Sequence, residues 1–351
     1  MTRGGGAVCQ HRKVLSSAAL VQSYDSLLLD LDGVVYIGAD PVPQAVATIS
    51  TVQQSGRRVC YVTNNAARPP GEVADHLIAL GLQASASDVV TSAQAGAQLV
   101  AAQTPRGSAV LAVGGPGVAA ALTEAGFVVV DAISDPLPDT GDDVAAVMQG
   151  FGTEVGWRAL ARASFAIARG IPWIATNTDL TIPVSGGVAP GNGTLVHAVA
   201  MATGRTPEVA GKPFPPLLLR ASEMSQGLRP LVVGDRLDTD IEGACNAKMS
   251  SLLVLTGVSR ALDLWRAPAT ARPQHLARDL SDLLRPALKV HLADGRTTSG
   301  PASARITGSH LDLDVAEDPV GAIWAAAHAI WAADAEPDNA VELAASLDEM
   351  L

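Results

Sequence analysis

Residues 26–35 read SLLLDLDGVV: an apolar run ends in two carboxylates, Asp30 and Asp32, with Gly33 behind them. Short apolar runs of this kind are typical of buried strands, and we predict one over residues 27–30. Like charges at the end of a buried strand repel each other unless a cation neutralises them. By itself the pattern D-x-D-G also occurs in calcium loops and plain turns, so its meaning depends on the rest of the chain.

The size and composition indicate a globular protein with more than one structural unit. The chain has 351 residues, of which 48% are hydrophobic and 3% are aromatic. This length predicts one large α/β domain with an inserted or appended unit. The formal net charge of -11 argues against a nucleic-acid or anionic-membrane partner, because such surfaces need clustered Lys and Arg.

The cysteines and the hydropathy pattern predict a cytoplasmic protein. Cys9, Cys60 and Cys245 are scattered without metal-ligand spacing, as expected for free thiols in a reducing compartment. No apolar run approaches the roughly 20 residues that span a bilayer. Residues 1–22 make a poor secretion signal, and we expect them to form a leader that does not pack.

Short apolar runs alternate with helical patterns along most of the chain, which predicts parallel strands joined by crossover helices. The ligand crevice of such sheets lies at the carboxyl ends of the strands. Pro105-Arg106-Gly107 interrupts the alternation, and a second series of strands follows. The expected units are a leader (1–22), a core in two parts (23–104 and 187–285), a separate α/β layer (105–186) and a C-terminal extension (286–351).

The C-terminal extension has a pattern of its own. Two strand-like runs, at 288–292 and at either 303–306 or 310–315, precede an Ala-rich helix at 320–333 and a closing helix at 340–350. Trp324 and Trp331 are seven residues apart and share one face of the first helix, which we expect to anchor it on the main body. The sequence predicts a small α+β extension and leaves its role open.

Two further motifs place hydrogen-bond donors where an anion could bind. Thr63, Asn64 and Asn65 follow the expected strand at 59–63, so a hydroxyl and two amides can donate to phosphate oxygens. Lys212 lies between a glycine and a proline, which restrict the backbone around it. Each has an ordinary alternative, since Thr63 could cap the strand end and Lys212 could be a surface charge.

The stretch GDRLDTD at 234–240 supplies two more acids. Asp235 ends another apolar run, and with Asp30 and Asp32 it forms a hard-oxygen site suited to Mg²⁺. Asp240 could orient metal-bound water or Lys212, or alternatively serve as a helix N-cap. The acids therefore predict a magnesium site at the carboxyl ends of the strands.

The motifs DLDGVV, TNN, GKP and GDRLDTDI, in this order, resemble those of the haloacid dehalogenase superfamily of phosphohydrolases, specifically its NagD-like branch. The match covers about residues 24–284. It implies a Rossmann-like, doubly wound parallel-sheet core with a large α/β cap of the C2 type, inserted between the TNN strand and the GKP lysine. The layer at 105–186 falls in that slot. Ala66 departs from the pattern, because relatives often have Ser there.

The resemblance also implies roles for the residues. Asp30 is the nucleophile that forms an aspartyl-phosphate, and Asp32 is the general acid and base. Mg²⁺ is held by Asp30, the main-chain carbonyl of Asp32 and Asp235, with Asp240 in support. The groups that bind the transferred phosphate are Thr63, Asn64, Asn65 and Lys212. Of these, Thr63 and Lys212 also take part in catalysis.

By this resemblance the substrate is a small phosphorylated metabolite. The whole chain is similar to actinobacterial glycerol 3-phosphate phosphatases, which implies glycerol 3-phosphate; 2-phosphoglycolate and nucleotide or pyridoxal phosphate are the alternatives. Caps of this branch often mediate dimers, so a homodimer is expected. Asn177 and Asp179 lie either near the junction of core and cap or in an ordinary turn.

A receiver-type signalling module is the rival from another functional class. Such a module also uses a phosphorylated Asp with Thr and Lys on a doubly wound sheet. It needs neither a cap nor a second carboxylate two residues after the acceptor. Asp32 and the inserted layer therefore favour an enzyme.

Overall fold

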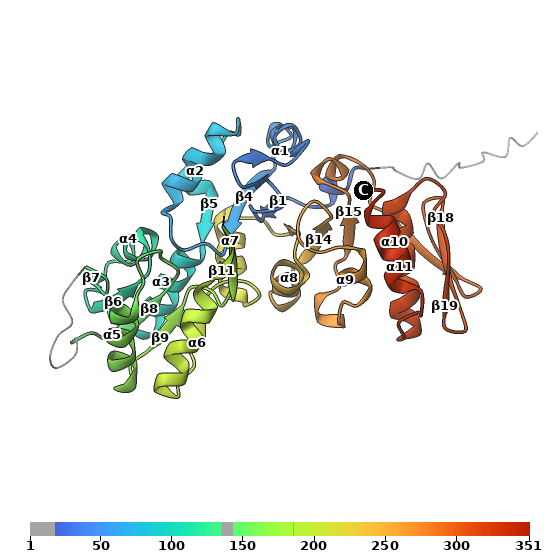
Figure 1. Ribbon diagram of the computed structural model, residues 1–351. Helices are drawn as coiled ribbons and strands as arrows, with labels where there is room; N and C mark the ends of the chain where they lie inside the picture. The colour runs from blue at the N-terminus through green and yellow to red at the C-terminus, as the bar shows by residue number, and fades with distance from the viewer. Residues whose placement is uncertain (1–17, 135–142, 185) are drawn as a thin grey trace, which may run out of the picture.

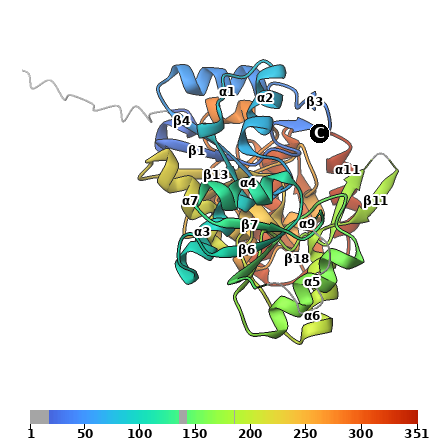
Figure 2. The same cartoon turned by 90° about the vertical axis from the view of Figure 1, so that its left-hand side faces the viewer.

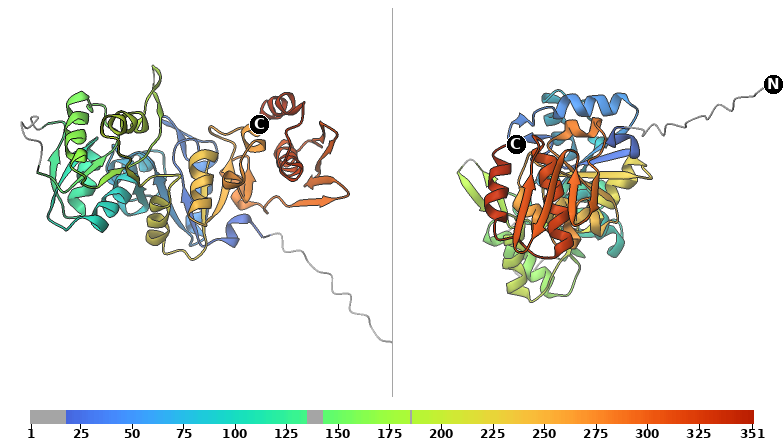
Figure 3. Two further views of the ribbon diagram at one scale, coloured as in Figure 1. Left: turned by 90° about the horizontal axis from the view of Figure 1, so that it is seen from below. Right: turned by 90° about the vertical axis from the view of Figure 1, so that its right-hand side faces the viewer.

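The computed structural model of the chain describes residues 18–134, 143–184 and 186–351. Three units follow one another along an elongated molecule, with the core in the middle (Figure 1, Figure 3). A second α/β unit lies on one side of the core and the C-terminal extension lies on the other.

The core is built on a six-stranded parallel sheet in the order β15-β14-β13-β1-β4-β5. All four residues of β1 are buried, because helices cover both faces of the sheet. Leu27 and Leu29 pack in the apolar cluster under α1 and α2, and Leu28 packs under α7 on the opposite face. The predicted Rossmann-like parallel core is confirmed. Its strands are β1 (Ser26–Leu29), β4 (Arg58–Thr63), β5 (Val89–Thr91), β13 (Pro230–Gly234), β14 (Ser250–Val254) and β15 (His275–Ala277).

Helices on the core begin where the sequence supplies a suitable first residue. Thr91 caps α3, since its hydroxyl accepts from the Gln94 backbone while the Gln94 side chain accepts from the Thr91 backbone. Prolines occupy the first turn of α2 and of α7, where no intrahelical donor is needed. The core helices are α1 (Ala45–Gln54), α2 (Pro70–Ala79), α3 (Ser92–Gln103), α7 (Pro215–Ser225), α8 (Glu242–Asn246) and α9 (Ala261–Trp265). A small hairpin, β2 (Tyr36–Ile37) with β3 (Asp40–Pro41), follows β1.

The second unit has a five-stranded parallel sheet in the order β12-β9-β8-β6-β7. Figure 2 shows α3 and α4 on one face of this sheet and α5 and α6 on the other, in agreement with the two apolar clusters of the unit. Its elements are β6 (Ala109–Val113), α4 (Pro116–Glu124), β7 (Val128–Asp131), β8 (Ala146–Gln149), α5 (Trp157–Ala168), β9 (Trp173–Ala175), the hairpin β10 (Thr181–Val184) with β11 (Gly187–Pro190), α6 (Asn192–Thr203) and β12 (Glu208–Val209).

This second unit extends beyond residue 186, where the sequence led us to end it. β12 pairs with β9, and α6 packs on α5. Glu208 and Val209 make too short a strand to stand out in the sequence, and the turn-rich hairpin before α6 looked like the return to the core. We therefore propose a boundary near residue 209 instead of 186.

Helix α3 packs on both sheets. Ala93 and Ala97 belong to the apolar cluster of the second unit, whereas Ala95 belongs to the core cluster under α7. A Cβ added to Gly96 would lie 3.0 Å from the sulfur of Met148, on β8. Small side chains thus allow α3 to lie close to the second sheet while it stays attached to the core.

The C-terminal extension is an antiparallel sheet in the order β16-β17-β18-β19, packed against a helix. The α+β character is confirmed, and both alternatives for the second strand exist, paired with each other as β18 and β19. The prediction missed β17, because its sequence RTTS is polar and does not alternate clearly. The elements are β16 (Val290–Ala293), β17 (Arg296–Ser299), β18 (Ala302–Thr307), β19 (His310–Asp314), α10 (Pro319–Ala333) and α11 (Ala340–Asp348).

Tryptophans join this extension to the core. Trp324 is buried in a cluster with Leu253 and Leu255 of the core. The Trp265 indole donates to the Ile323 carbonyl at 3.0 Å, and the Trp331 indole donates to the Leu264 carbonyl at 3.2 Å. The predicted anchoring role of Trp324 and Trp331 is therefore confirmed.

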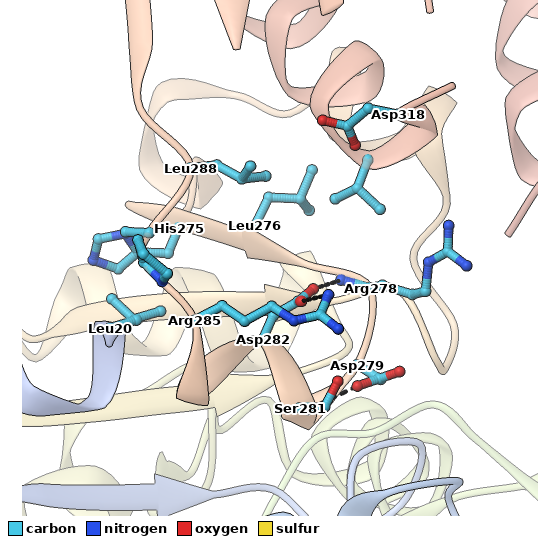
Figure 4. A pocket seen from close by; sticks show the side chains of 13 residues that line it. Leu20, His275, Leu276, Arg278, Asp279, Ser281, Asp282, Arg285, Leu288 and Asp318 are labelled. Carbon is cyan, nitrogen blue, oxygen red and sulfur yellow. Dashed lines mark hydrogen bonds and ion pairs between the residues drawn. The ribbon is translucent and has the colours of Figure 1, made fainter. Parts of the chain in front are cut away.

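A cavity of about 390 Å³ lies where the C-terminal extension meets the core, between the last core strand and the start of α10 (Figure 4). Two of its charged side chains pair with each other, Arg285 with Asp282 at 3.1 Å, and the Arg278 backbone donates to the same carboxylate at 2.9 Å. The cavity shares no residue with the acids at the strand ends.

The expected leader is packed in part. Residues 1–17 lie outside the described part of the chain, but Leu20–Ser23 forms a short 3-10 turn, η1. Leu20 and Val21 are buried in the core, and the Leu20 amide donates to the Arg285 carbonyl at 2.7 Å. The expectation that residues 1–22 do not pack was wrong for Leu20 and Val21, whose side chains belong to the apolar cluster of the core.

The described residues contain no helix long and apolar enough to cross a membrane. Among the cysteines that the structure describes, Cys60 is buried and Cys245 is exposed, and both are free thiols.

Replacement of Trp324 tests the packing of the C-terminal extension on the core. We expect Trp324→Ala to lower the free energy of unfolding by about 3–5 kcal/mol, because a large buried side chain is removed from a packed cluster. Urea unfolding followed by circular dichroism measures this change. Trp157→Ala is the matched control, since Trp157 is 75% exposed and its loss should change the free energy of unfolding by less than about 0.5 kcal/mol. Equal effects of the two changes would contradict the anchoring role.

Candidate active site

Acids from separate parts of the chain meet at the carboxyl edge of the core sheet. Asp30 follows β1 and Asp235 follows β13, and these two strands are neighbours. Asp240 lies in a π-helical turn, η3 (Leu237–Ile241), just after β13. One carboxylate oxygen from each of Asp30, Asp235 and Asp240 lies within 4.8 Å of the others. The sheet order thus brings together Asp30 and Asp235, two of the three acids of the predicted site, and the third member of the cluster is Asp240 in place of the Asp32 side chain.

Lys212 lies inside this cluster. Its Nζ is 2.5 Å from Asp30 Oδ1 and 2.7 Å from Asp240 Oδ1, and its side chain is 3% exposed. The alternative of a surface charge is thereby excluded. Asp240 Oδ2 accepts from the Arg236 backbone at 3.2 Å, so Asp240 both holds the turn and orients Lys212.

The charges do not balance. Three carboxylates and one ammonium carry a net charge of -2 when all four are ionised. Burial raises the pKa of Asp30 well above its usual range; the Lys212 charge opposes this, and Asp240 and Asp235 add to it. Burial, with the Asp240 charge, raises the pKa of Asp235 to about 6. Although burial disfavours the ammonium form, Asp240 and Asp30 raise the pKa of Lys212.

The donor set fits a hard divalent cation. Asp235 Oδ2 accepts from the Val258 backbone at 2.7 Å, whereas Asp235 Oδ1 is buried and has no hydrogen-bond partner among the residues that the structure describes. A buried carboxylate oxygen without a partner is costly in an apolar surrounding. Oxygen ligands from several carboxylates are those that Mg²⁺ prefers, and the +2 charge would offset the net charge of the cluster.

Two glycines leave room for Asp235, and sequence reasoning missed one of them. A Cβ on Gly257 would lie 2.0 Å from Asp235 Oδ2, and a Cβ on Gly33, whose φ is +79°, would lie 2.6 Å from the same atom. Gly257 follows β14, in the sequence TGVS. A glycine just after a predicted strand was the signal that could have pointed to Gly257. Because no acid stands beside it, the sequence analysis did not include it in the site.

Asp32 lies at the mouth of the cluster. The residue is exposed, yet desolvation of its carboxyl group raises its pKa, an effect that the charges of Lys212, Arg68 and His76 oppose. The Gly33 amide donates to the Tyr36 carbonyl at 2.8 Å, which turns the chain back beside Asp32. A carboxyl group with a raised pKa near solvent is suited to proton transfer.

The side chains of Thr63, Asn64 and Asn65 each form hydrogen bonds within the protein. Thr63 Oγ1 accepts from the Asn65 backbone at 3.0 Å, so the hydroxyl caps the strand end and can still donate. The Asn64 side chain is bound to Lys212 and to Asp179. Asn65 is exposed, and its Oδ1 accepts from the Ala67 backbone. The roles of Thr63, Asn64 and Asn65 in phosphate binding stay predictions.

Asn177 and Asp179 lie at the junction of the two α/β units. Asn177 Nδ2 donates to the Asn64 carbonyl at 2.7 Å, and Asp179 accepts from Asn64 Nδ2 at 3.2 Å. Ala66 is buried beside Val118 of the second unit. A Ser side chain there would place its hydroxyl in an apolar cluster, which accounts for the departure noted in the sequence.

A change at Gly257 tests whether the space beside Asp235 is needed for cation binding. We expect Gly257→Ala to weaken Mg²⁺ binding, measured by isothermal titration calorimetry, by about 10–100-fold, because the new Cβ displaces a carboxylate of the site. Gly156→Ala is the matched control, since a Cβ there would have no atom of the described part of the chain within 4 Å. Unchanged affinity in Gly257→Ala would show that Asp235 does not serve the cation.

Comparisons with known proteins agree with this geometry. A haloacid dehalogenase-like hydrolase model matches residues 27–128, and a second model of HAD-like hydrolases matches residues 209–283. The D-glycerol 3-phosphate phosphatase of Mycobacterium tuberculosis is 41% identical over 322 residues, which cover 90% of this chain and 88% of that protein. The acid sugar phosphatase of Staphylococcus aureus is 34% identical over 267 residues, which cover 75% of this chain and 98% of that protein.

A solved structure is similar along almost the whole chain. The glycerol phosphate phosphatase of Mycobacterium tuberculosis, crystallised with magnesium, superposes with a TM-score of 0.81 at 37% identity, covering 95% of this chain and 100% of that one. The match therefore includes the second unit and the C-terminal extension as well as the core. With its parallel core, the two family matches at 27–128 and 209–283 and relatives that are 41% and 34% identical, the chain belongs to the haloacid dehalogenase-like hydrolases.

Proposed function

We propose that this protein is a Mg²⁺-dependent phosphatase that hydrolyses a small phosphate monoester through an aspartyl-phosphate. The observation that carries the proposal is the position of Lys212 Nζ, which is 2.5 Å from Asp30 Oδ1 inside a cluster of three acids. A nucleophilic carboxylate needs nearby positive charge before a phosphate dianion can approach it. The buried ammonium and the cation site provide that charge.

In the first step, Asp30 attacks phosphorus in line with the leaving oxygen. The bond from Asp30 to phosphorus forms as the bond to the alkoxide breaks, and Asp32 gives its proton to that alkoxide. Lys212 and Thr63 donate to the oxygens of the transferred group. When bound, Mg²⁺ would be held by Asp30, the main-chain carbonyl of Asp32 and Asp235, and it supplies positive charge against the developing negative charge.

In the second step, the aspartyl-phosphate is hydrolysed. Asp32, now ionised, accepts a proton from water, and the oxygen of that water attacks phosphorus. The bond from phosphorus to Asp30 breaks, which releases phosphate and restores the carboxylate. Asp240 keeps Lys212 in place through both steps, because the two groups are 2.7 Å apart and buried.

Glycerol 3-phosphate is the substrate that we propose. The support comes from the 41% identical relative named D-glycerol 3-phosphate phosphatase, which this chain matches over 88% of its length. The second unit would act as the cap that covers the crevice and selects the leaving group. 2-Phosphoglycolate and nucleotide or pyridoxal phosphate remain the alternatives. A homodimer and a cytoplasmic location also stay proposals.

Variants of the two acids in DLDG test the mechanism. We expect Asp30→Asn to reduce phosphate release to the assay background, since the amide is a poor nucleophile, and Asp32→Asn to reduce kcat by about 10²–10⁴-fold, since proton transfer is lost. Asp25→Asn is a control at the opposite end of β1, where Asp25 accepts from the Arg229 backbone. Substantial turnover by Asp30→Asn would exclude the covalent route.

A substrate panel tests the specificity and the metal. With Mg²⁺, we expect kcat/KM for glycerol 3-phosphate to exceed the values for 2-phosphoglycolate, pyridoxal phosphate and a nucleoside monophosphate. Removal of the metal with EDTA should abolish turnover of all four, and added Mg²⁺ should restore it. Turnover that persists in EDTA would exclude the metal-dependent mechanism, whereas a different preferred ester would change only the substrate.

A further inference from the structure

The Asn64 side chain joins three segments that are far apart in the sequence. Asn64 follows β4, Lys212 follows β12, and Asp179 lies between β9 and β10. Asn64 Nδ2 lies 3.0 Å from the Lys212 carbonyl, 3.2 Å from Asp179 Oδ1 and 3.3 Å from Asp179 Oδ2. Its Oδ1 accepts from the Lys212 amide at 2.8 Å. Both polar atoms of this side chain are therefore engaged by protein groups.

The pairing with Lys212 requires a carboxamide. The Lys212 amide donates to Asn64 Oδ1 while the Lys212 carbonyl accepts from Asn64 Nδ2, so one side chain binds both backbone polar groups of the lysine. An aspartate of the same shape has no donor for that carbonyl. A Cβ on Gly211 would lie 2.7 Å from Asn64 Oδ1, which shows how closely the two segments approach.

Asp179 brings the second unit into the same contact. Its own backbone amide donates to Asn177 Oδ1 at 3.2 Å, and Asn177 Nδ2 donates to the Asn64 carbonyl at 2.7 Å. Asn192, the first residue of α6, donates to the Asn177 carbonyl at 2.7 Å. The cap is thus tied, through amide and carboxylate groups, to the residue that fixes the backbone of Lys212.

We propose that Asn64 and Asp179 form a clasp that positions Lys212 and couples its position to the docking of the second unit. The inference rests on the proposed function, because Lys212 is the group whose position matters for phosphoryl transfer. In this role Asn64 does not bind the phosphate through its side chain. Asp179 is a positioning residue that acts through Asn64 and does not touch the substrate.

A reciprocal exchange of donor and acceptor tests the clasp with glycerol 3-phosphate and Mg²⁺. We expect Asn64→Asp to lower kcat by about 10²-fold, because two carboxylates then face each other and the Lys212 carbonyl loses its donor. In the double variant with Asp179→Asn, the new amide donates to the new carboxylate. This should raise kcat about tenfold above that of Asn64→Asp alone, which is an interaction of about 1.4 kcal/mol.

A second pair of variants does not depend on Asn64→Asp. We expect Asp179→Ala to lower kcat about tenfold with KM changed by less than about twofold, and the isosteric Asp179→Asn to recover most of the loss, because its Oδ1 still accepts from Asn64. Thr194→Ala is the matched control. Thr194 is exposed, and its hydroxyl donates to the carbonyl of Leu180, the residue after Asp179, so the kcat of Thr194→Ala should equal that of the unaltered protein.

Several results would overturn the clasp. A double variant no more active than Asn64→Asp would exclude coupling between the two residues. A rise in KM at unchanged kcat in Asn64→Asp would indicate direct phosphate binding by the Asn64 side chain. Wild-type kcat in Asp179→Ala would exclude a role for Asp179. If the unaltered protein releases no phosphate from any ester, that result contradicts the proposed function and not the clasp. Failure of the clasp and failure of the proposed function are therefore distinguishable.

Discussion

The ammonium of Lys212, held between Asp30 and Asp240, is the contact on which the site depends. Without it, three carboxylates would face one another in a buried space, and their mutual repulsion would oppose folding of the strand ends. With it, one negative charge is matched and two remain, which is the imbalance that a divalent cation corrects. The same lysine therefore serves the stability of the fold and the proposed chemistry.

The sheet order makes this contact possible. β1 lies between β13 and β4, so the residues that follow these three strands share one edge although they are distant in the sequence. Lys212 reaches the same edge from the end of the second unit. Gly33 and Gly257 then allow the loops after β1 and β14 to approach the Asp235 carboxylate more closely than any larger residue would. The sheet order brings the charged residues to one edge, and glycines determine how closely the neighbouring loops approach them.

The core strands and the acids Asp30 and Asp235 could be predicted from the sequence. Each of these acids ends an apolar run, which indicates a buried strand and places the acid at the carboxyl end of that strand. Other features depend on contacts that no local pattern reveals. β17 is polar, and β12 has two residues, so neither gives a periodic signal. The motif around Asn64 adjoins the site, which is why the sequence predicts a phosphate ligand there, but it does not reveal that the Asn64 side chain also binds Asp179 and Lys212, which are 115 and 148 residues away.

Helix α3 limits how the crevice can open. Ala93, Gly96 and Ala97 pack against the second sheet, whereas Ala95 packs in the core cluster under α7. A rotation of the second unit alone would separate these close-packed surfaces and leave apolar gaps, which is unfavourable in a dense interior. Substrate entry is therefore expected to use small sliding adjustments along α3, of the shear type, in place of a wide swing about a free hinge.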